Sequence, residues 1–180
     1  MTSPETIGVS RPIYAAQVTH LKSARLTARP TRESDLLFFQ QLWSDPRVMA
    51  YLGSPRSPEA TRSALEQSTR MWREHGFGRW IVFDAEEPVG TVKLAPVGIH
   101  DREEVELGYA LAPQFWGRGY AAEAAAAVLG FARETANLDE IVAFALVGNT
   151  ASIAVMQRLN IRPAGTFERP EEGTFCTDDS

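Results

Sequence analysis

The chain has 180 residues, 44% of them hydrophobic, which suits a single globular domain with its own buried core. It carries 18 Lys and Arg residues against 23 Asp and Glu residues, so its formal net charge is -5. Because a protein that follows a phosphate backbone needs a basic surface, this balance argues against nucleic acid as the main partner.

Hydrophobic periodicity and capping residues predict an alternation of strands and helices. Ser57 followed by Pro58 begins one helix that should end at Gly76, and Thr31 is expected to cap the helix before it. In chain order, the expected elements are a strand at 25–29, a helix at 31–44, a helix at 57–75, strands at 80–83, 89–94 and 104–111, a helix at 120–136, a strand at 141–147, a helix at 149–159 and a strand at 164–168.

This order predicts one mixed α/β domain. A strand and two helices precede a three-strand meander, and a helix, a strand, a helix and a strand follow it. The domain is expected to cover residues 23–180, because no repeat or linker divides that stretch. Residues 1–22 show no clear pattern and are interpreted as an N-terminal arm.

The most informative segment is the turn between the strand at 104–111 and the helix at 120–136. Gly117 and Gly119 let the chain bend closely at the start of that helix. A helix start presents unpaired N–H groups and the positive end of the helix dipole, so the turn can hold a pyrophosphate, with Arg118 as a further charged contact.

Two other interpretations of this turn are weaker. The letters Gly117-x-Gly119-x-x-Ala122 also fit a dinucleotide fingerprint, but that motif follows its strand directly within a parallel unit, and here residues 113–116 intervene. A phosphate-binding loop of the Walker type requires a Gly-Lys-Ser/Thr sequence, which is missing. An ordinary strand-to-helix turn remains the plain alternative.

Other classes of site find little support in the residues. Cys176 is the only cysteine, so no internal disulfide forms, and no positioned base accompanies it. The three histidines lack metal-ligand spacing, so no metal is expected. The start of the chain lacks an export signal, and the most apolar stretch, 121–132, is too short to cross a bilayer. A cytoplasmic protein without membrane contact is therefore expected.

The segment Gln114-x-x-Gly117-x-Gly119 resembles the acyl-CoA signature of the GNAT superfamily of N-acetyltransferases. The longer stretch that starts Glu106-Leu-Gly-Tyr and continues through Trp-Gly-Arg-Gly-Tyr-Ala-Ala-Glu123 is similar to the RimJ/RimL-like branch. Further matches lie in the same order at 25–30, 43–46, 76–80 and 149–155, so the resemblance covers about residues 23 to 168.

The resemblance implies a fold and an activity. The fold is an α/β GNAT fold, with a mostly antiparallel central sheet, a parallel splayed strand pair that holds acyl-CoA, and about four flanking helices. The activity is transfer of the acetyl group of acetyl-CoA to a primary amine, on a protein N-terminus or a small molecule, by direct attack. The alternative is a catalytically silent GNAT fold that binds acyl-CoA as a sensor or scaffold.

The resemblance also implies the residues that hold the cosubstrate. Leu111 and Ala112 would pair with the pantetheine arm through their backbone, and Asn149 would lie beside the thiol. The remaining cofactor-binding residues belong to the signature and its turn: Gln114, Gly117, Arg118, Gly119, Tyr120 and Ala121.

Two side chains are candidates for catalysis. A base helps because most amines are protonated at neutral pH, and Glu106 projects from its strand beside the expected cleft. Glu104 points the same way and is the second choice; a salt-bridged strand glutamate is the plain alternative. The resemblance implies that Ser152 protonates the departing thiolate, although it can equally be an ordinary helix residue.

The C-terminal edge of the sheet is expected to be incomplete or to be completed in an unusual way. After the strand at 164–168, an acidic turn at 169–173 and a short apolar run at 174–177 contain proline and glycine, which disfavour a long strand. An unpaired edge is a pairing site, so a homodimer that covers it is expected; a truncated chain is the alternative.

Overall fold

A computed structural model describes residues 19–99, 102–169 and 173–177. In chain order its elements are β1 (Leu21–Lys22), β2 (Leu26–Pro30), the 3-10 turn η1 (Glu33–Asp35), α1 (Leu36–Ser44), α2 (Pro46–Met49), α3 (Pro58–His75), β3 (Arg79–Asp84), β4 (Glu87–Ile99), β5 (Arg102–Leu111), η2 (Pro113–Phe115), α4 (Tyr120–Glu134), β6 (Val142–Ala143), β7 (Ala145–Leu146), α5 (Thr150–Arg158), β8 (Gly165–Arg169) and β9 (Gly173–Thr177).

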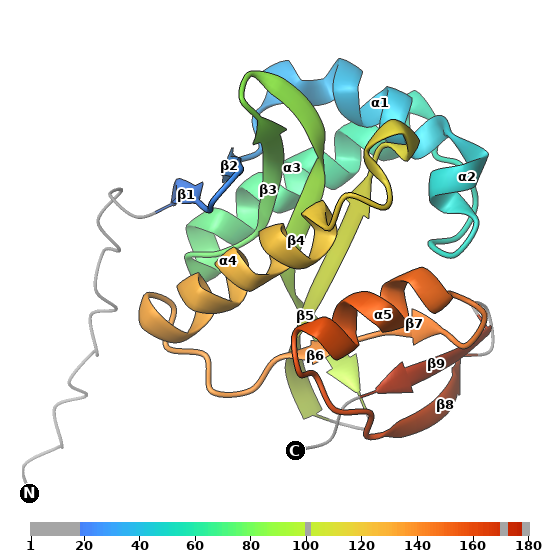
Figure 1. The fold of residues 1–180 in the computed structure, drawn as a ribbon. Coiled ribbons are helices and arrows are strands. Elements are labelled where there is room, and N and C mark those ends of the chain that lie inside the picture. Colours follow the sequence, from blue (N-terminus) through green and yellow to red (C-terminus); the bar gives the residue numbers. More distant parts are fainter. Residues whose placement is uncertain (1–18, 100–101, 170–172, 178–180) are drawn as a thin grey trace, which may run out of the picture.

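The strands form two sheets (Figure 1). The larger has the order β1-β2-β3-β4-β5-β6, and all its neighbours are antiparallel except β5 and β6, which are parallel. The smaller has the order β7-β9-β8 and is antiparallel. The predicted α/β class is therefore confirmed, with a mostly antiparallel sheet and one parallel pair.

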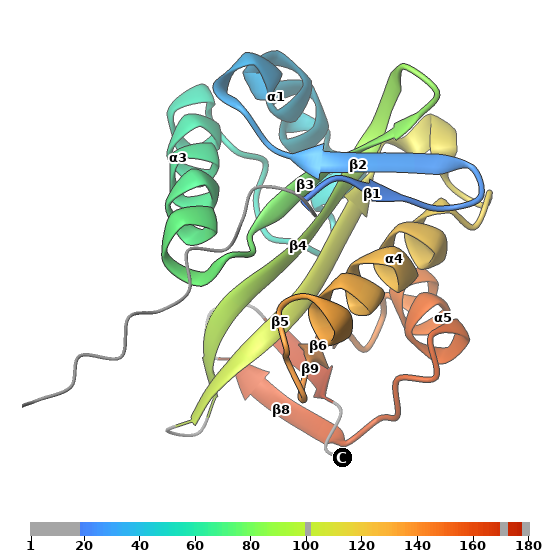
Figure 2. The ribbon, with the colours of Figure 1, turned by 90° about the vertical axis from the view of Figure 1, so that its left-hand side faces the viewer.

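Helices cover both faces of the larger sheet. Figure 2 shows α1 and α3 on one side of the strands, with α4 and α5 on the other. The core between them is aromatic: the fully buried Trp80 ring lies 4.6 Å from Trp72 of α3 and 5.2 Å from Phe131 of α4, both edge to face. Truncating such a residue to alanine costs about 3–5 kcal/mol, so this contact anchors both helix layers.

One of the two predicted helix starts is confirmed. At α3, Ser57 Oγ accepts the N–H of Ala60 at 3.2 Å, and Gly76 ends the helix in the left-handed region at φ 75. Thr31 does not cap the first helix, because its hydroxyl lies 3.1 Å from Ser68 Oγ of α3 in a buried pair. A buried hydroxyl needs a partner, and here the partner comes from another helix.

The strand predicted at 141–147 is broken in two. β6 pairs with β5 only at Glu106↔Val142 and Leu107↔Ala143, and β7 then pairs with β9 of the smaller sheet. The apolar run is continuous, so its sequence gives no sign of the break. As a result β5 stays paired with β4 but, among the described strands, has no partner on its other side from Gly108 onward, and a gap opens between β5 and β7.

Of the two expectations for the C-terminal edge, the incomplete one is wrong: a separate three-stranded sheet completes it. β9 is paired on both sides, by β7 at two positions and by β8 from Gly165↔Thr177 to Arg169↔Gly173. Of the two residue types that disfavoured one long strand, Gly173 begins β9, and Pro170 lies outside the described residues. An unpaired β9 edge therefore no longer supports the expected homodimer, which stays a prediction.

At the N-terminal end, Leu21 and Lys22 were placed in the arm but pair with β2 as β1. The rest of the arm, residues 1–18, lies outside the described residues. Within the described residues, no helix is long and apolar enough to cross a bilayer, and no cluster of three metal-ligating side chains occurs.

Candidate functional site

A cavity of about 880 Å³ opens where β5 and β7 part. Leu107, Tyr109 and Leu111 of β5 line it together with Glu106 and other residues of the opposite strand face. Since side chains of successive strand residues point to opposite faces, the cavity reaches both sides of the sheet through the gap. The same cavity is lined by the turn before α4, by α5 and by the segment around α2.

The hydrogen-bond pattern of β5 decides which of its backbone groups face the gap. The N–H of Ala112 donates to Val89 O of the β4 side at 2.9 Å, and bonding to an antiparallel neighbour alternates along a strand. The backbone groups of Tyr109 and Leu111 therefore point away from β4 and toward the gap. The carbonyl of Leu111 accepts the indole N–H of Trp116 at 2.7 Å, which leaves its N–H available.

This pattern corrects one predicted site residue. Ala112 was expected to pair with a pantetheine arm, but its N–H is bound to Val89, and its carbonyl accepts the N–H of Phe115 at 2.9 Å. Tyr109 lies two residues before Leu111, and its backbone N–H and carbonyl face the gap, whereas those of Ala112 are already hydrogen-bonded. The correction follows from strand register, which depends on the partner strand.

The glycine turn after β5 has two residues in the left-handed region. Gly117 and Gly119 both adopt the left-handed region, at φ 76 and 79, with Arg118 between them. Alternating conformations of this kind turn successive N–H groups toward one point. Gly119 is the N-cap of α4 and has no side-chain cap, so the first N–H groups of the helix stay available to a ligand.

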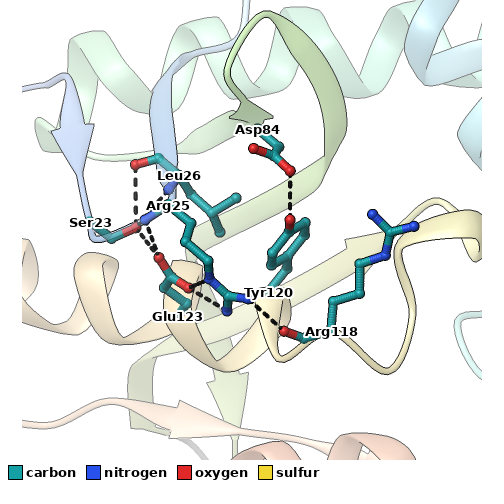
Figure 3. A network of polar contacts seen from close by, with 7 residues as sticks. All are labelled: Ser23, Arg25, Leu26, Asp84, Arg118, Tyr120 and Glu123. Atoms are coloured by element: carbon teal, nitrogen blue, oxygen red, sulfur yellow. Dashed lines mark hydrogen bonds and ion pairs between the residues drawn. The ribbon is translucent and has the colours of Figure 1, made fainter.

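A polar network holds this turn against the first hairpin (Figure 3). The carboxylate of Glu123 in α4 accepts hydrogen bonds from Ser23 Oγ at 2.7 Å, from the N–H of Arg25 at 2.8 Å and from Arg25 Nε at 2.7 Å. The Arg25 guanidinium also donates to the carbonyl of Arg118 at 3.0 Å. Glu123 and Arg25 therefore tie the β1–β2 turn, the start of α4 and the glycine turn together.

Tyr120 adds a second tie from the same helix turn. Its hydroxyl donates to Asp84 Oδ2 at 2.5 Å, at the end of β3. This bond raises the pKa of Tyr120, and burial acts in the same direction, so the phenol stays protonated as a donor. The side chain thus has a structural task, while its backbone N–H belongs to the helix start.

Across the gap, Tyr109 meets Ser152 of α5. The two hydroxyl oxygens lie 2.8 Å apart, and Tyr109 Oη also donates to the carbonyl of Ser152 at 3.1 Å. Burial raises the pKa of Tyr109, although the Ser152 bond lowers it in part. Both hydroxyls therefore carry protons at neutral pH, and both residues line the cavity.

On the opposite face of β5, Glu106 forms an ion pair with Lys93 of β4, whose Nζ lies 2.7 Å from Glu106 Oε2. About a quarter of each side chain is exposed. The Lys93 stem lies over Gly108, since a Cβ there would come within 2.5 Å of it. Glu104, the second choice for a base, pairs with Arg102 instead and does not line the cavity.

Most predicted site residues come together at this cavity, and three do not. Ala112, Gln114 and Arg118 are absent from its lining, and Gln114 is exposed. Asn149 lines it while its Oδ1 caps α5 by accepting the N–H of Ser152 at 3.1 Å. The predicted residues in the lining are Glu106, Leu111, Gly117, Gly119, Tyr120, Ala121, Asn149 and Ser152.

Sequence reasoning missed several residues of the site. Tyr109 stands inside the quoted Glu-Leu-Gly-Tyr stretch, so a signal for it was present. Arg56, Arg79 and Lys93 also line the cavity, but they are up to 37 positions apart (93 minus 56) and share no motif. Only the pairing of β3 with β4 and the packing of α1 bring them together.

Comparisons with known proteins agree with this geometry. The family model described as "Acetyltransferase (GNAT) domain" matches residues 25–162. The "FsC-acetyl coenzyme A-N(2)-transacetylase" of Aspergillus fumigatus is 32% identical over 157 residues, which cover 82% of this chain and 66% of that protein.

Solved structures show the same fold. An acetyltransferase from Agrobacterium tumefaciens superposes with a TM-score of 0.75 at 26% identity, over 99% of this chain and 100% of the other. RimL, the ribosomal L7/L12 alpha-N-protein acetyltransferase in complex with coenzyme A, has a TM-score of 0.75 at 20% identity, over 88% and 96% of the two chains. At that identity, the likeness to RimL concerns the fold.

Proposed function

This chain belongs to the GNAT acetyltransferase family, and we propose that it transfers the acetyl group of acetyl-CoA to a primary amine. One observation carries the proposal. The parted strands β5 and β7, the glycine turn before α4 and the Tyr109–Ser152 pair all open onto the same cavity.

The residues around the cavity suit a coenzyme A thioester. The left-handed glycines and the uncapped helix start offer N–H groups to a pyrophosphate. The free edge of β5 at Tyr109 and Leu111 offers backbone groups to the amides of a pantetheine arm, as a further strand would. Asn149 and Ser152, at the start of α5, would then lie beside the thiol.

When bound, acetyl-CoA supplies an activated acetyl thioester, and the protein has three tasks. Tyr109 and Leu111 each turn an N–H toward the gap, and the one that the pantetheine arm does not use can stabilise negative charge that develops on the acetyl oxygen. Glu106 is the only acid among the described residues of the lining, and it takes the amine proton directly or through a water. Ser152 gives a proton to the departing sulfur and regains one from solvent, while the hydrogen bond with Tyr109 holds the Ser152 hydroxyl in place.

The acceptor is the finer part of the proposal. RimL is named as acting on a ribosomal protein N-terminus, and the Aspergillus relative is named as an N(2)-transacetylase. We place this chain with such RimJ/RimL-like enzymes as an acetyltransferase of amines, and a cytoplasmic homodimer stays part of that proposal.

Release of free coenzyme A from acetyl-CoA, measured with a panel of small amines and short peptides, tests the activity. We expect amine-dependent thiol release together with an acetylated product of matching mass. Tight binding of acetyl-CoA in calorimetry without turnover of any amine would instead identify a silent acyl-CoA sensor.

A further inference from the structure

The charge of the cavity is opposite to that of the whole chain. The described residues of its lining include Arg47, Arg56, Arg79, Lys93 and Arg158 but only one acid, Glu106, although the formal net charge of the protein is -5. Arg47 is neutralised by Asp45 at 2.6 Å. Arg158 lies on α5, on the side proposed for the cosubstrate, so Arg56, Arg79 and Lys93 remain to be explained.

These three cations gather on the α1 side of the sheet. Arg79 of β3 stands directly opposite Lys93 of β4, which in turn stands opposite Gly108 of β5. Arg56 comes from the loop before α3, and its guanidinium lies 4.5 Å from the centre of the Trp43 ring, against 4.9 Å for Arg79. The cross-strand neighbours Arg79 and Lys93, and the packing of Arg56 and Arg79 on the Trp43 ring, therefore bring the three cations to one wall of the cavity.

Among the described residues, only one of these three cations forms an ion pair with a carboxylate. Glu106 pairs with Lys93, while neither Arg56 nor Arg79 has a carboxylate within ion-pair distance among the described residues. Like charges opposite each other on a sheet are unfavourable, and an aromatic ring shields a cation without supplying a counter-charge.

Burial adds to this cost. The Nε atom of Arg79 is buried and has no hydrogen-bond partner in the described part of the chain. Burial, aided by the charge of Arg56 and opposed by that of Glu106, lowers the pKa of Arg79 to about 10, and burial also lowers the pKa of Lys93 and of Arg56. A native protein seldom leaves a buried donor unpaired unless a ligand satisfies it.

The phosphates of coenzyme A do not account for these cations. The glycine turn that suits a pyrophosphate follows Leu111, whereas Lys93 stands opposite Gly108, about 10 Å back along β5 at the usual rise per residue. Arg79 is one further strand away, and its side chain shares the face of Glu106, the proposed base, rather than that of Ser152. The cations thus belong to the acceptor side.

We infer that the acceptor amine carries an anionic group, a carboxylate or a phosphate, which Arg56, Arg79 and Lys93 bind while the amine lies beside Glu106. This rests on the proposed acetyl transfer and names its substrate class. Neighbouring strands are about 4.8 Å apart, so the anion site lies one strand beyond the Lys93–Glu106 pair, and only a few bonds separate amine and anion. A guanidinium fork matches the oxygens of either anion.

The test compares matched acceptors at saturating acetyl-CoA. Leucine is paired with leucinamide, and phosphoethanolamine with ethanolamine, and kcat/KM is expressed per neutral amine so that differences in amine pKa cancel. We expect at least one anionic member to be preferred by roughly tenfold or more, as a charge-assisted hydrogen bond provides. The pair that shows the preference identifies carboxylate or phosphate. Equal rates within both pairs overturn the inference while leaving acetyl transfer standing.

Variants locate the effect. Arg56→Gln and Arg79→Gln should each reduce the preference roughly tenfold, whereas Arg47→Gln removes the same charge from the rim and should leave the preference as it is. If Arg79→Gln does not fold, Arg56→Gln, whose side chain comes from a loop, still decides. A preference that survives Arg56→Gln, or that Arg47→Gln abolishes equally, contradicts the assignment.

A binding measurement separates the two proposals. If no amine is acetylated, the proposed function fails, and calorimetry of coenzyme A-saturated protein with N-acetyl-leucine and N-acetyl-leucinamide then tests the anion site alone. Tighter binding of the acid, lost in Arg56→Gln, supports the site. Equal affinities overturn it.

Discussion

Tyr109 Oη lies 2.8 Å from Ser152 Oγ and joins the free edge of β5 to the first turn of α5. The contact spans the gap between the two sheets, and it connects a residue that the sequence singled out with one that it did not. Because Tyr109 Oη donates its single proton to the carbonyl of Ser152, its oxygen can accept from Ser152 Oγ, and the pair fixes the position of the serine hydroxyl.

Tyr109→Phe should therefore lower kcat about tenfold, with little change in acetyl-CoA affinity, because the Ser152 hydroxyl loses the hydrogen bond that positions it for proton transfer. Ser152→Ala should lower kcat by a similar factor. Steady-state kinetics of both variants and of the double variant provide the check. Residues that act as one unit are not additive, so full additivity in the double variant would show that they act separately.

Glu106→Gln should lower turnover more than acetyl-CoA affinity, and the loss should be largest at low pH. Without a base, only amine that is already neutral can attack, and this fraction falls as pH falls. Glu104→Gln is the matched control, since Glu104 also lies on β5 but pairs with Arg102 outside the cavity. Superimposable pH–rate profiles of Glu106→Gln and the native protein would assign Glu106 a structural role.

Gly119→Ala should weaken acetyl-CoA binding in calorimetry and destabilise the protein by about 1–2 kcal/mol. An added Cβ has room, with Arg25 at 3.6 Å, but φ 79 is unfavourable for alanine. Gly130→Ala in the middle of α4 meets open space at an ordinary helical φ and should stabilise by about 0.5–1 kcal/mol. Equal affinity of both variants for acetyl-CoA would contradict the cosubstrate site.

Glu123→Gln should loosen the clamp on the glycine turn, costing about 1–2 kcal/mol and weakening acetyl-CoA binding a few-fold. Burial raises the pKa of Glu123, but bonds from Ser23 and Arg25 outweigh it and lower the pKa below its ordinary 4.5. The carboxylate therefore stabilises the fold above that ordinary pKa, and this stability is lost as pH falls through the lowered value.

Thermal melts between pH 3 and pH 7 test the clamp. The gap in melting temperature between native protein and Glu123→Gln should narrow at the acid end of that range. Glu134→Gln, at the exposed C-terminal end of the same helix, should show no such narrowing. A constant gap across the range would mean that the Glu123 charge does not stabilise the turn.

Sequence reasoning failed at the strand predicted for 141–147 and at the chain end for different reasons. An apolar run indicates a buried strand but does not identify the strand that it pairs with. The sequence therefore could not predict that this segment pairs with β5 before Phe144 and with β9 after it. At the end of the chain, proline and glycine were taken as strand breakers. The strands β8 and β9 nevertheless form and pair with each other, because partner strands supply the hydrogen bonds that local sequence does not reveal.

What the sequence by itself determined is local: the order of most of the longer elements, the Ser57 start and Gly76 end of α3, and the glycine turn at the start of α4. Those features depend on the backbone preferences of residues a few positions apart. Only the tertiary structure decided that Tyr109 faces Ser152, that the N–H of Ala112 is taken by Val89, and that Arg56 and Arg79 converge on Trp43. These contacts join residues far apart along the chain, and strand register and helix packing alone bring them within bonding distance.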